Sequence, residues 1–120
     1  MKASPGKHGR LSQHFTSSEL ECPHCHACIV QPELVLLLER IRRILGKPLP
    51  IIDGYRCPTH NYAVGGAADS QHMYGTAADL PAGLVDMTQA RNAGAVGIGR
   101  SHGFAVHVDV RRGAHVEWVY

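Results

Sequence analysis

The stretch 70–79 reads SQHMYGTAAD and places His72 and Asp79 seven residues apart. For both side chains to bind one ion, their donor atoms must come within about 3.5 Å, since zinc–nitrogen and zinc–oxygen bonds are about 2.0–2.2 Å long. A continuous helix would separate the two Cα atoms by roughly 10 Å along its axis, and a straight strand by roughly 23 Å. The chain must therefore turn back between them, and Gly75 can form that turn without a Cβ penalty. Residues 76–80 then read as a short buried strand that carries Asp79.

The same stretch resembles the signature Ser-x-His-x-x-Gly-x-Ala-x-Asp of the zinc D-Ala-D-Ala carboxypeptidases and related murein endopeptidases, the hedgehog-like metallopeptidases. Every specified position is filled, by Ser70, His72, Gly75, Ala77 and Asp79. The likeness extends from about residue 15 to the end of the chain. It implies a zinc metallopeptidase that hydrolyses peptide bonds in bacterial peptidoglycan stem peptides, as a carboxypeptidase or an endopeptidase. A capped turn with a partly exposed histidine is the alternative interpretation of the stretch by itself.

A second informative segment is His107-Val108-Asp109. In a strand, Val106, Val108 and Val110 would face one side and His107 and Asp109 the other. His107 is therefore the predicted third ligand, beside His72 and Asp79. Two histidines and one carboxylate with an open fourth position are typical of a catalytic zinc rather than a structural one.

The catalytic proton acceptor is harder to place. The resembling enzymes generally carry an acid a few residues before the third ligand, and here Phe104 stands three residues before His107. We predict Asp109 as the general base, because it shares a strand face with His107. His102 is predicted as an accessory proton donor or oxyanion stabiliser, and Glu117 is the reserve candidate for the base.

Substrate binding is predicted at Arg56 and Ser70. Arg56 lies in Gly54-Tyr55-Arg56, where the resembling family carries an arginine. A guanidinium binds a carboxylate through two parallel hydrogen bonds, which suits a peptide with a free C-terminus.

Four cysteines form a separate pattern: Cys22, Cys25, Cys28 and Cys57. The spacing of two residues between the first three is typical of zinc knuckles, with His24, His26 and His60 as spare ligands. Two disulfides are the rival interpretation, and free buried thiols are the third. The sequence therefore predicts one catalytic zinc and leaves open a second, structural zinc at the cysteines.

Composition narrows the class of protein. With 12 Lys and Arg against 10 Asp and Glu, the net charge of +2 shows no electrostatic footprint for nucleic acid. No apolar run is long enough for a membrane-spanning helix, and no apolar stretch follows the basic start, as a secretory signal would require. We expect a monomer that acts on the cell wall, outside the cytoplasm or after phage release, without nucleic-acid partners or membrane insertion.

Runs of strand and helix without βαβ alternation predict an α+β fold in which helices pack on a small, mainly antiparallel sheet. The family resemblance implies a fold like that of hedgehog proteins and DD-peptidases. We expect a loose N-terminal segment at residues 1–13 and a single domain at 14–120. Helices are predicted at 32–45 and at 88–93, where Thr88 is the cap, with a turn capped by Thr16 near the start. Strands are predicted at 49–53, 76–80, 96–99, 104–110 and 115–120, and the last two are joined by the turn at residues 111–113.

Two other functions are weighed against the peptidase. A non-catalytic zinc-binding module of the same fold would explain the missing acid near position 104. A Cys/His zinc-knuckle interaction protein would make residues 22–28 the functional surface, although the near-neutral charge does not favour it.

Overall fold

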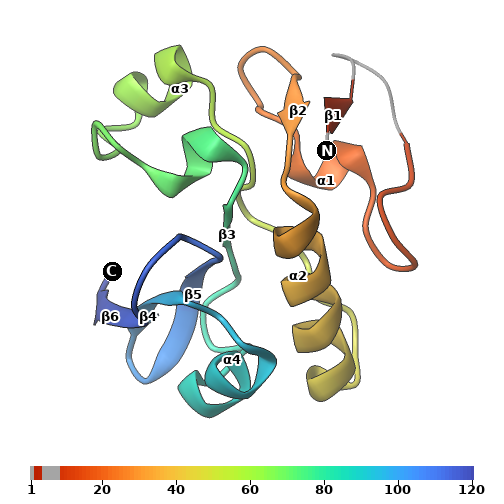
Figure 1. Ribbon diagram of the computed structural model, residues 1–120, viewed down its shortest axis with the longest axis vertical. Coiled ribbons are helices and arrows are strands. Elements are labelled where there is room, and N and C mark those ends of the chain that lie inside the picture. Colours follow the sequence, from red (N-terminus) through yellow and green to blue (C-terminus); the bar gives the residue numbers. More distant parts are fainter. Residues whose placement is uncertain (1, 4–8) are drawn as a thin grey trace.

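The computed structural model describes residues 2–3 and 9–120, and in this part of the chain a four-stranded sheet is covered by helices (Figure 1). Its strands are β3 (Ala77–Asp79), β4 (Gly97–Ser101), β5 (Phe104–Asp109) and β6 (Val116–Val119), in the order β3-β5-β4-β6. β5 pairs antiparallel with both β3 and β4, whereas β6 runs parallel to β4. The prediction of an α+β fold with a mainly antiparallel sheet is confirmed.

Helix α2 spans Pro32–Leu45, the bounds that the sequence predicts. Pro32 suits the first helical position because its missing N–H would be unpaired there in any residue. One apolar stripe of the helix, which includes Leu34, Leu38 and Ile41, is buried, and Gly46 ends the helix in the left-handed conformation with φ 72°.

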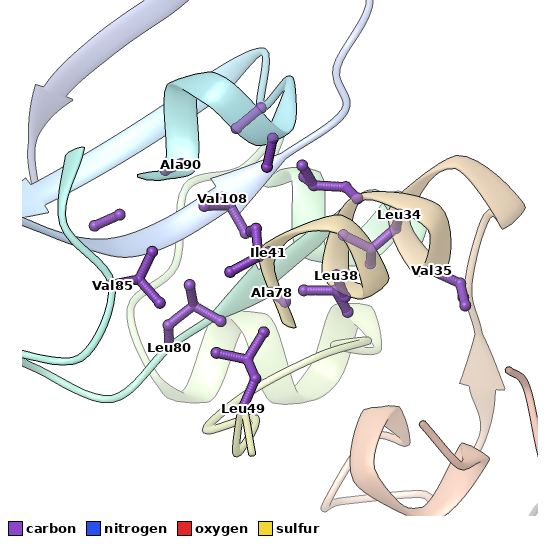
Figure 2. Close-up of a cluster of buried hydrophobic side chains, with 14 of the residues drawn as sticks. Leu34, Val35, Leu38, Ile41, Leu49, Ala78, Leu80, Val85, Ala90 and Val108 are labelled. Carbon is purple, nitrogen blue, oxygen red and sulfur yellow. The ribbon is translucent and has the colours of Figure 1, made fainter. Parts of the chain in front are cut away.

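One hydrophobic core joins α2, α4 (Met87–Ala93) and one face of the sheet (Figure 2). Leu38 and Ile41 of α2 meet Ala78 of β3, Val108 of β5 and Ala90 of α4 in this cluster. Because side chains alternate along a strand, burial of Ala78 and Val108 leaves the opposite face of β3 and β5 to their polar neighbours. That face carries the candidate site.

The N-terminal part of the domain packs around shorter elements. Helix α1 (Ser17–Leu20) begins at Thr16, and the Thr16 N–H donates to Glu19 Oε1 at 3.0 Å, which completes the predicted capping box. Strand β1 (Lys2–Ala3) pairs with β2 (Cys28–Ile29).

Residues 9–13 of the predicted loose segment are fastened by hydrogen bonds, for example from the Gly9 N–H to Ser17 Oγ at 2.8 Å. Residues 1 and 4–8 of that segment lie outside the described part. The division of the chain at residue 13 stays a prediction.

Three predicted elements differ in the structure. Residues 49–53 form no strand, because Pro48 and Pro50 offer no N–H to a ladder, and pairing begins only at the isolated bridge between Asp53 and Asp79. Helix α4 is capped by Asp86, whose side chain accepts from the Gln89 N–H at 2.7 Å, so Thr88 lies inside the first turn.

The third difference concerns the last strand. β6 does not form a hairpin with β5 across residues 111–113; it crosses to the far side of β4 and pairs with it in parallel. Two short helices complete the chain, α3 (Pro58–Ala63) and the 3₁₀ helix η1 (Gln71–Tyr74). Within the described residues, no helix has the length and apolar character needed to cross a membrane.

Candidate active site

The short helix η1 contains His72 and fixes the position of this side chain in the site. The Ser70 hydroxyl oxygen caps η1 by accepting from the His72 N–H at 3.2 Å, and Gly75 closes it in the left-handed conformation with φ 71°. A Cβ at Gly75 would lie 2.3 Å from the Ile29 carbonyl oxygen, so only glycine fits the predicted turn. The ring Nδ1 lies 2.8 Å from the Gly54 carbonyl oxygen. Since a carbonyl only accepts, the proton is on Nδ1 and the unprotonated Nε2 is free to bind an ion.

Asp79 is brought to the site by strand pairing. Its register partner on β5 is His107, and on its other side the isolated bridge pairs it with Asp53. Asp79 Oδ1 lies 3.2 Å from His72 Nε2 and 3.3 Å from His107 Nδ1. Its second oxygen, Oδ2, accepts from the Tyr120 hydroxyl at 3.0 Å. The carboxylate thus offers Oδ1 to the two histidines and is fixed through Oδ2.

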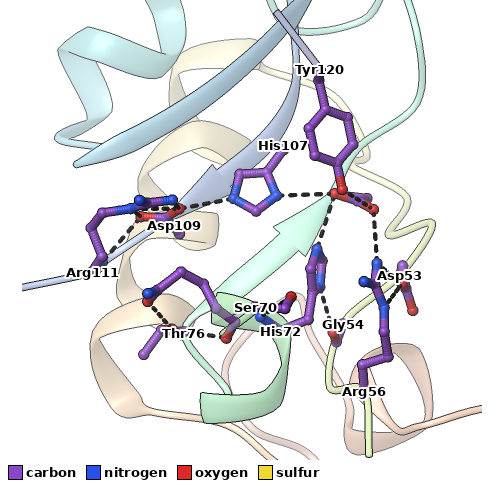
Figure 3. Close-up of polar contacts among 12 residues, drawn as sticks. Asp53, Gly54, Arg56, Ser70, His72, Thr76, His107, Asp109, Arg111 and Tyr120 are labelled. Carbon is purple, nitrogen blue, oxygen red and sulfur yellow. Dashed lines mark hydrogen bonds and ion pairs between the residues drawn. The ribbon is translucent and has the colours of Figure 1, made fainter. Parts of the chain in front are cut away.

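His107 presents the opposite ring nitrogen from His72. Its Nε2 lies 2.8 Å from Asp109 Oδ2 (Figure 3), so that Nδ1 faces Asp79. The ring contacts His72 edge-on at 5.2 Å between centroids, and Trp118 and Tyr120 lie at 5.0 and 5.1 Å. His107 Nδ1 is buried and has no hydrogen-bond partner among the described residues. A buried ring nitrogen that lacks a hydrogen-bond partner and faces a carboxylate has the environment expected of a metal ligand.

The three predicted ligands meet the geometric requirement for one ion. Nitrogen atoms of His72 and His107 and a carboxylate oxygen of Asp79 all lie within 4.8 Å of one another. Two imidazoles and a carboxylate form a donor set that suits zinc, with bond lengths of about 2.0–2.2 Å. The residues therefore fit a metal ion of this kind.

Electrostatics support a charged carboxylate at the centre. Burial by itself would raise the pKa of Asp79, but its contacts with His107 and His72 outweigh that effect and hold the pKa well below the ordinary value. Burial likewise opposes charge on His107, yet Asp109 and Asp79 together raise its pKa above the ordinary value.

Asp109 lies at the site but not where the sequence predicts. Its side chain is fully buried and contacts His107 Nε2, on the far side of the ring from Asp79. Arg111 also donates to it, from Nη2 to Oδ2 at 2.7 Å, and these partners hold the pKa of Asp109 well below its ordinary value despite burial. Residues two apart share a strand face, as expected, but the imidazole lies between Asp109 and the ligand atoms. This geometry suits a residue that orients His107, and the role of Asp109 as general base stays a prediction.

The two other residues predicted for proton transfer are Glu117 and His102. Glu117 faces α4, where Arg91 donates to both of its oxygens at 2.7 Å, so the reserve assignment of the base to Glu117 is not supported. His102 is exposed on the turn between β4 and β5, and its Nδ1 lies 3.1 Å from Ser101 Oγ.

Arg56 reaches the site, but protein groups already occupy much of its guanidinium. Its Nη2 and Nε donate to Asp53 Oδ2 at 2.7 and 3.0 Å, and Nη1 donates to Asn61 Oδ1 at 3.0 Å. Nη2 also lies 3.6 Å from Asp79 Oδ2. Binding of a substrate carboxylate by Arg56 stays a prediction, and so does such a role for Ser70, whose hydroxyl oxygen caps η1.

Sequence reasoning missed Tyr120 and Asp53, which surround Asp79. Tyr120 was detectable in principle, because alternation along the last strand places it on the same face as Trp118. Asp53 gave no local signal, since only the bridge to Asp79 brings it into the site.

Three of the four cysteines come together elsewhere. The Sγ atoms of Cys22, Cys25 and Cys57 all lie within 4.8 Å of one another. Cys28 is separate and lies buried in the hydrophobic core. Strand β2 directs the Cys28 side chain into that core, so Cys28 does not join the other three cysteines.

Fold and site together define an α+β protein with a cluster of two histidines and an aspartate that could hold a metal ion. A model of the family described as Peptidase M15 matches residues 13–109, and the chain belongs to that family.

Two individual proteins are similar to this chain. The zinc D-Ala-D-Ala carboxypeptidase of Streptomyces albus G is 43% identical over 68 residues, a segment that covers 56% of this chain and 25% of that protein. This match thus spans a quarter of the relative's length. The crystal structure of the Serratia marcescens L-Ala D-Glu endopeptidase ChiX matches with a TM-score of 0.51 at 21% identity, over 68% of this chain and 80% of that one. It shows the likeness of the fold.

Proposed function

We propose that this protein is a zinc-dependent peptidase that hydrolyses peptide bonds in the stem peptides of bacterial peptidoglycan. The observation that carries the proposal is the convergence of His72 Nε2, Asp79 Oδ1 and His107 Nδ1, each side chain having its other polar atom held by a second group. A divalent ion held there supplies Lewis acidity and activates water for attack on a carbonyl. The similar proteins named above, one a D-Ala-D-Ala carboxypeptidase and one an L-Ala D-Glu endopeptidase, support the substrate class.

Tyr120 has a part in this proposal as a hydrogen-bond donor. Burial and the neighbouring Asp79 carboxylate raise the pKa of Tyr120 to about 12. The phenol is therefore protonated at neutral pH and donates its single O–H to Asp79 Oδ2, the carboxylate oxygen that does not face the two histidines. His102 is the remaining candidate for proton transfer, and its exposed position on a turn leaves it free to meet a bound substrate.

The test is release of peptide fragments from purified peptidoglycan. We expect release by the wild type, loss after treatment with a chelator, recovery on adding zinc, and no release by His72→Ala. The masses of the fragments identify the bond that is cut, and so distinguish a carboxypeptidase from an endopeptidase. The absence of any fragment from wild-type protein loaded with zinc would contradict the proposal.

A non-catalytic zinc-binding module of the same fold is the second candidate. The engagement of Asp109 with His107 and Arg111 favours it, because that carboxylate does not face the ligand atoms. Sedimentation with peptidoglycan at full zinc occupancy, without release of fragments, would establish this module instead of the peptidase.

The site of action stays a proposal as well. Peptidoglycan as substrate requires that the protein reach the cell wall, in the periplasm, outside the cell, or after phage lysis.

A further inference from the structure

A second cluster of metal-binding side chains lies outside the histidine–aspartate–histidine centre. It consists of Cys22, Cys25 and Cys57, whose Sγ atoms lie within 4.8 Å of one another. His24 joins them, because its Nδ1 lies 3.5 Å from Cys57 Sγ. In a tetrahedral zinc site with a Zn–S bond of about 2.3 Å and a Zn–N bond of about 2.0 Å, neighbouring sulfur and nitrogen ligands are about 3.5 Å apart. The observed distance therefore matches an edge of such a tetrahedron.

Backbone N–H groups point at two of the sulfurs. The Cys57 N–H approaches Cys22 Sγ at 3.5 Å, and the His60 N–H approaches Cys57 Sγ at 3.4 Å. The loop from residue 22 is closed by hydrogen bonds from the Cys22 N–H to the Ala27 oxygen and from the His26 N–H to the Cys22 oxygen, at 2.8 and 2.7 Å. These hydrogen bonds within the protein therefore fix the shape of the loop without the help of an ion.

We propose that Cys22, His24, Cys25 and Cys57 bind a structural zinc ion, and that Cys28 is not one of its ligands. Three thiolates and one imidazole fill all four positions, and closed sites of this composition are structural in zinc proteins. A disulfide between any two of the three clustered cysteines would leave the third unpaired, since Cys28 lies in the core. A zinc ion, in contrast, would bind all three clustered cysteines together with His24.

This ion would act at a distance on the candidate active site. Cys57 follows directly on residues 54–56, whose backbone holds η1: the Gly54 oxygen accepts from the His72 ring, and the Arg56 N–H donates to the His72 oxygen at 3.1 Å. Linking Cys57 to residues 22–25 fastens this segment to the N-terminal part of the domain. The role is one of positioning, and it does not depend on whether the first centre catalyses hydrolysis.

The test is the number of zinc ions per chain, measured by native mass spectrometry together with elemental analysis. We expect two ions for the wild type and one for Cys57→Ser, Cys22→Ser and His24→Ala. Cys28→Ala is the matched control and should retain both ions. His72→Ala should lose the other ion, and after replacement with cobalt it should keep the thiolate-to-cobalt absorption that Cys57→Ser lacks.

Wild-type protein provides a second measurement in case the cysteine variants do not fold. Cys22, Cys25 and Cys57 should resist alkylation until a chelator removes the ion, and then react. Two results would overturn the proposal: an intact disulfide among these cysteines in protein purified without reductant, or unchanged zinc content in a folded Cys57→Ser variant. Loss of an ion from Cys28→Ala together with its retention in His24→Ala would overturn the ligand assignment.

Discussion

Each of the three proposed ligand side chains at the candidate active site is oriented by a group that is not one of these ligands. The Gly54 carbonyl fixes the ring of His72, Asp109 fixes that of His107, and Tyr120 binds the second oxygen of Asp79. The two histidines thus use opposite nitrogens, Nε2 in His72 and Nδ1 in His107. Such partners set the tautomer and the basicity of a ligand, so their loss weakens metal binding without removing a ligand.

Asp109→Asn should therefore lower zinc affinity by roughly 10–100-fold, because the amide cannot hold His107 Nε2–H as a carboxylate does. The affinity is measured by competition with a chromophoric chelator, with turnover followed on the same preparation. Glu117→Gln is the control, since Glu117 is a carboxylate on the α4 side of the sheet. Unchanged affinity together with turnover reduced by about 10²–10⁴-fold would return Asp109 to the role of general base.

Arg56→Lys tests what the guanidinium does. An ammonium cannot contact Asp53 and Asn61 together as the planar guanidinium does. If these contacts are its main role, the variant should lose activity to a similar degree on peptides with a free and with an amidated C-terminus. A loss confined to free-acid peptides would show instead that Arg56 binds the substrate carboxylate.

At the scale of elements, two glycines in β4 make room for the centre. Gly97 is paired with Asp109 and Gly99 with His107. A Cβ at Gly97 would lie 2.3 Å from an Asp109 carboxylate oxygen, and one at Gly99 would lie 2.8 Å from the Tyr120 ring. The alternation that predicts a strand at 96–99 does not reveal this need for glycine, because the side chains that require the space come from other parts of the chain.

Gly97→Ala should lower the free energy of unfolding by about 1–3 kcal/mol, the usual cost of an overpacked interior. Displacement of Asp109 should weaken zinc binding as well. Urea unfolding of the metal-free protein measures the first effect and chelator competition the second. Gly9→Ala is the control, since its Cβ would meet only Ser17 Oγ at 3.9 Å. Equal stability of the two variants would show that β4 and β5 can move apart at this position.

The ion pair between Arg91 of α4 and Glu117 of β6 predicts a pH dependence. Arg91, and then His115, lower the pKa of Glu117 from 4.5 to about 2. Because the folded-state pKa is depressed, the contribution to stability is present above the ordinary value of 4.5 and is lost as the pH falls towards about 2. Urea midpoints of the wild type should therefore exceed those of Glu117→Gln near neutral pH and converge with them in acid. A difference that persists in strong acid would contradict the assignment.

Local patterns predicted some elements well and others not at all. Helix α2 and the turn at Gly75 were predictable because their signals, an apolar stripe with Pro32 and a glycine between two ligands, lie within a few residues. The path of β6 was not predictable, because the pairing of β6 with β4 is decided by long-range packing rather than by the turn at residues 111–113. The same holds for Asp109: a shared strand face was foreseen, whereas the position of the imidazole between Asp109 and the ligand atoms depends on side-chain rotamers.

At the scale of the whole molecule, the candidate active site joins segments that are far apart in the chain. His72 comes from η1 and Asp79 from β3, whereas His107 comes from β5. Without a metal, the contacts between Asp79 and the two histidines hold this junction. An ion bound to all three side chains binds only the folded chain, and such a ligand stabilises by about 2.7 kcal/mol when its free concentration is 100 times its Kd.

Zinc should therefore raise the melting temperature of protein previously stripped of metal, and His107→Ala should lose the part of the increase that belongs to this centre. The zinc-induced increase that remains in His107→Ala should come from binding at the cysteine cluster. Cys57→Ser should lose this second part of the increase. Differential scanning calorimetry over a series of zinc concentrations measures both. His14→Ala is the control, because that exposed histidine pairs with Glu39 away from either centre. An identical zinc-induced increase in His107→Ala and the wild type would show that His107 does not bind the ion, and the three-ligand centre would have to be abandoned.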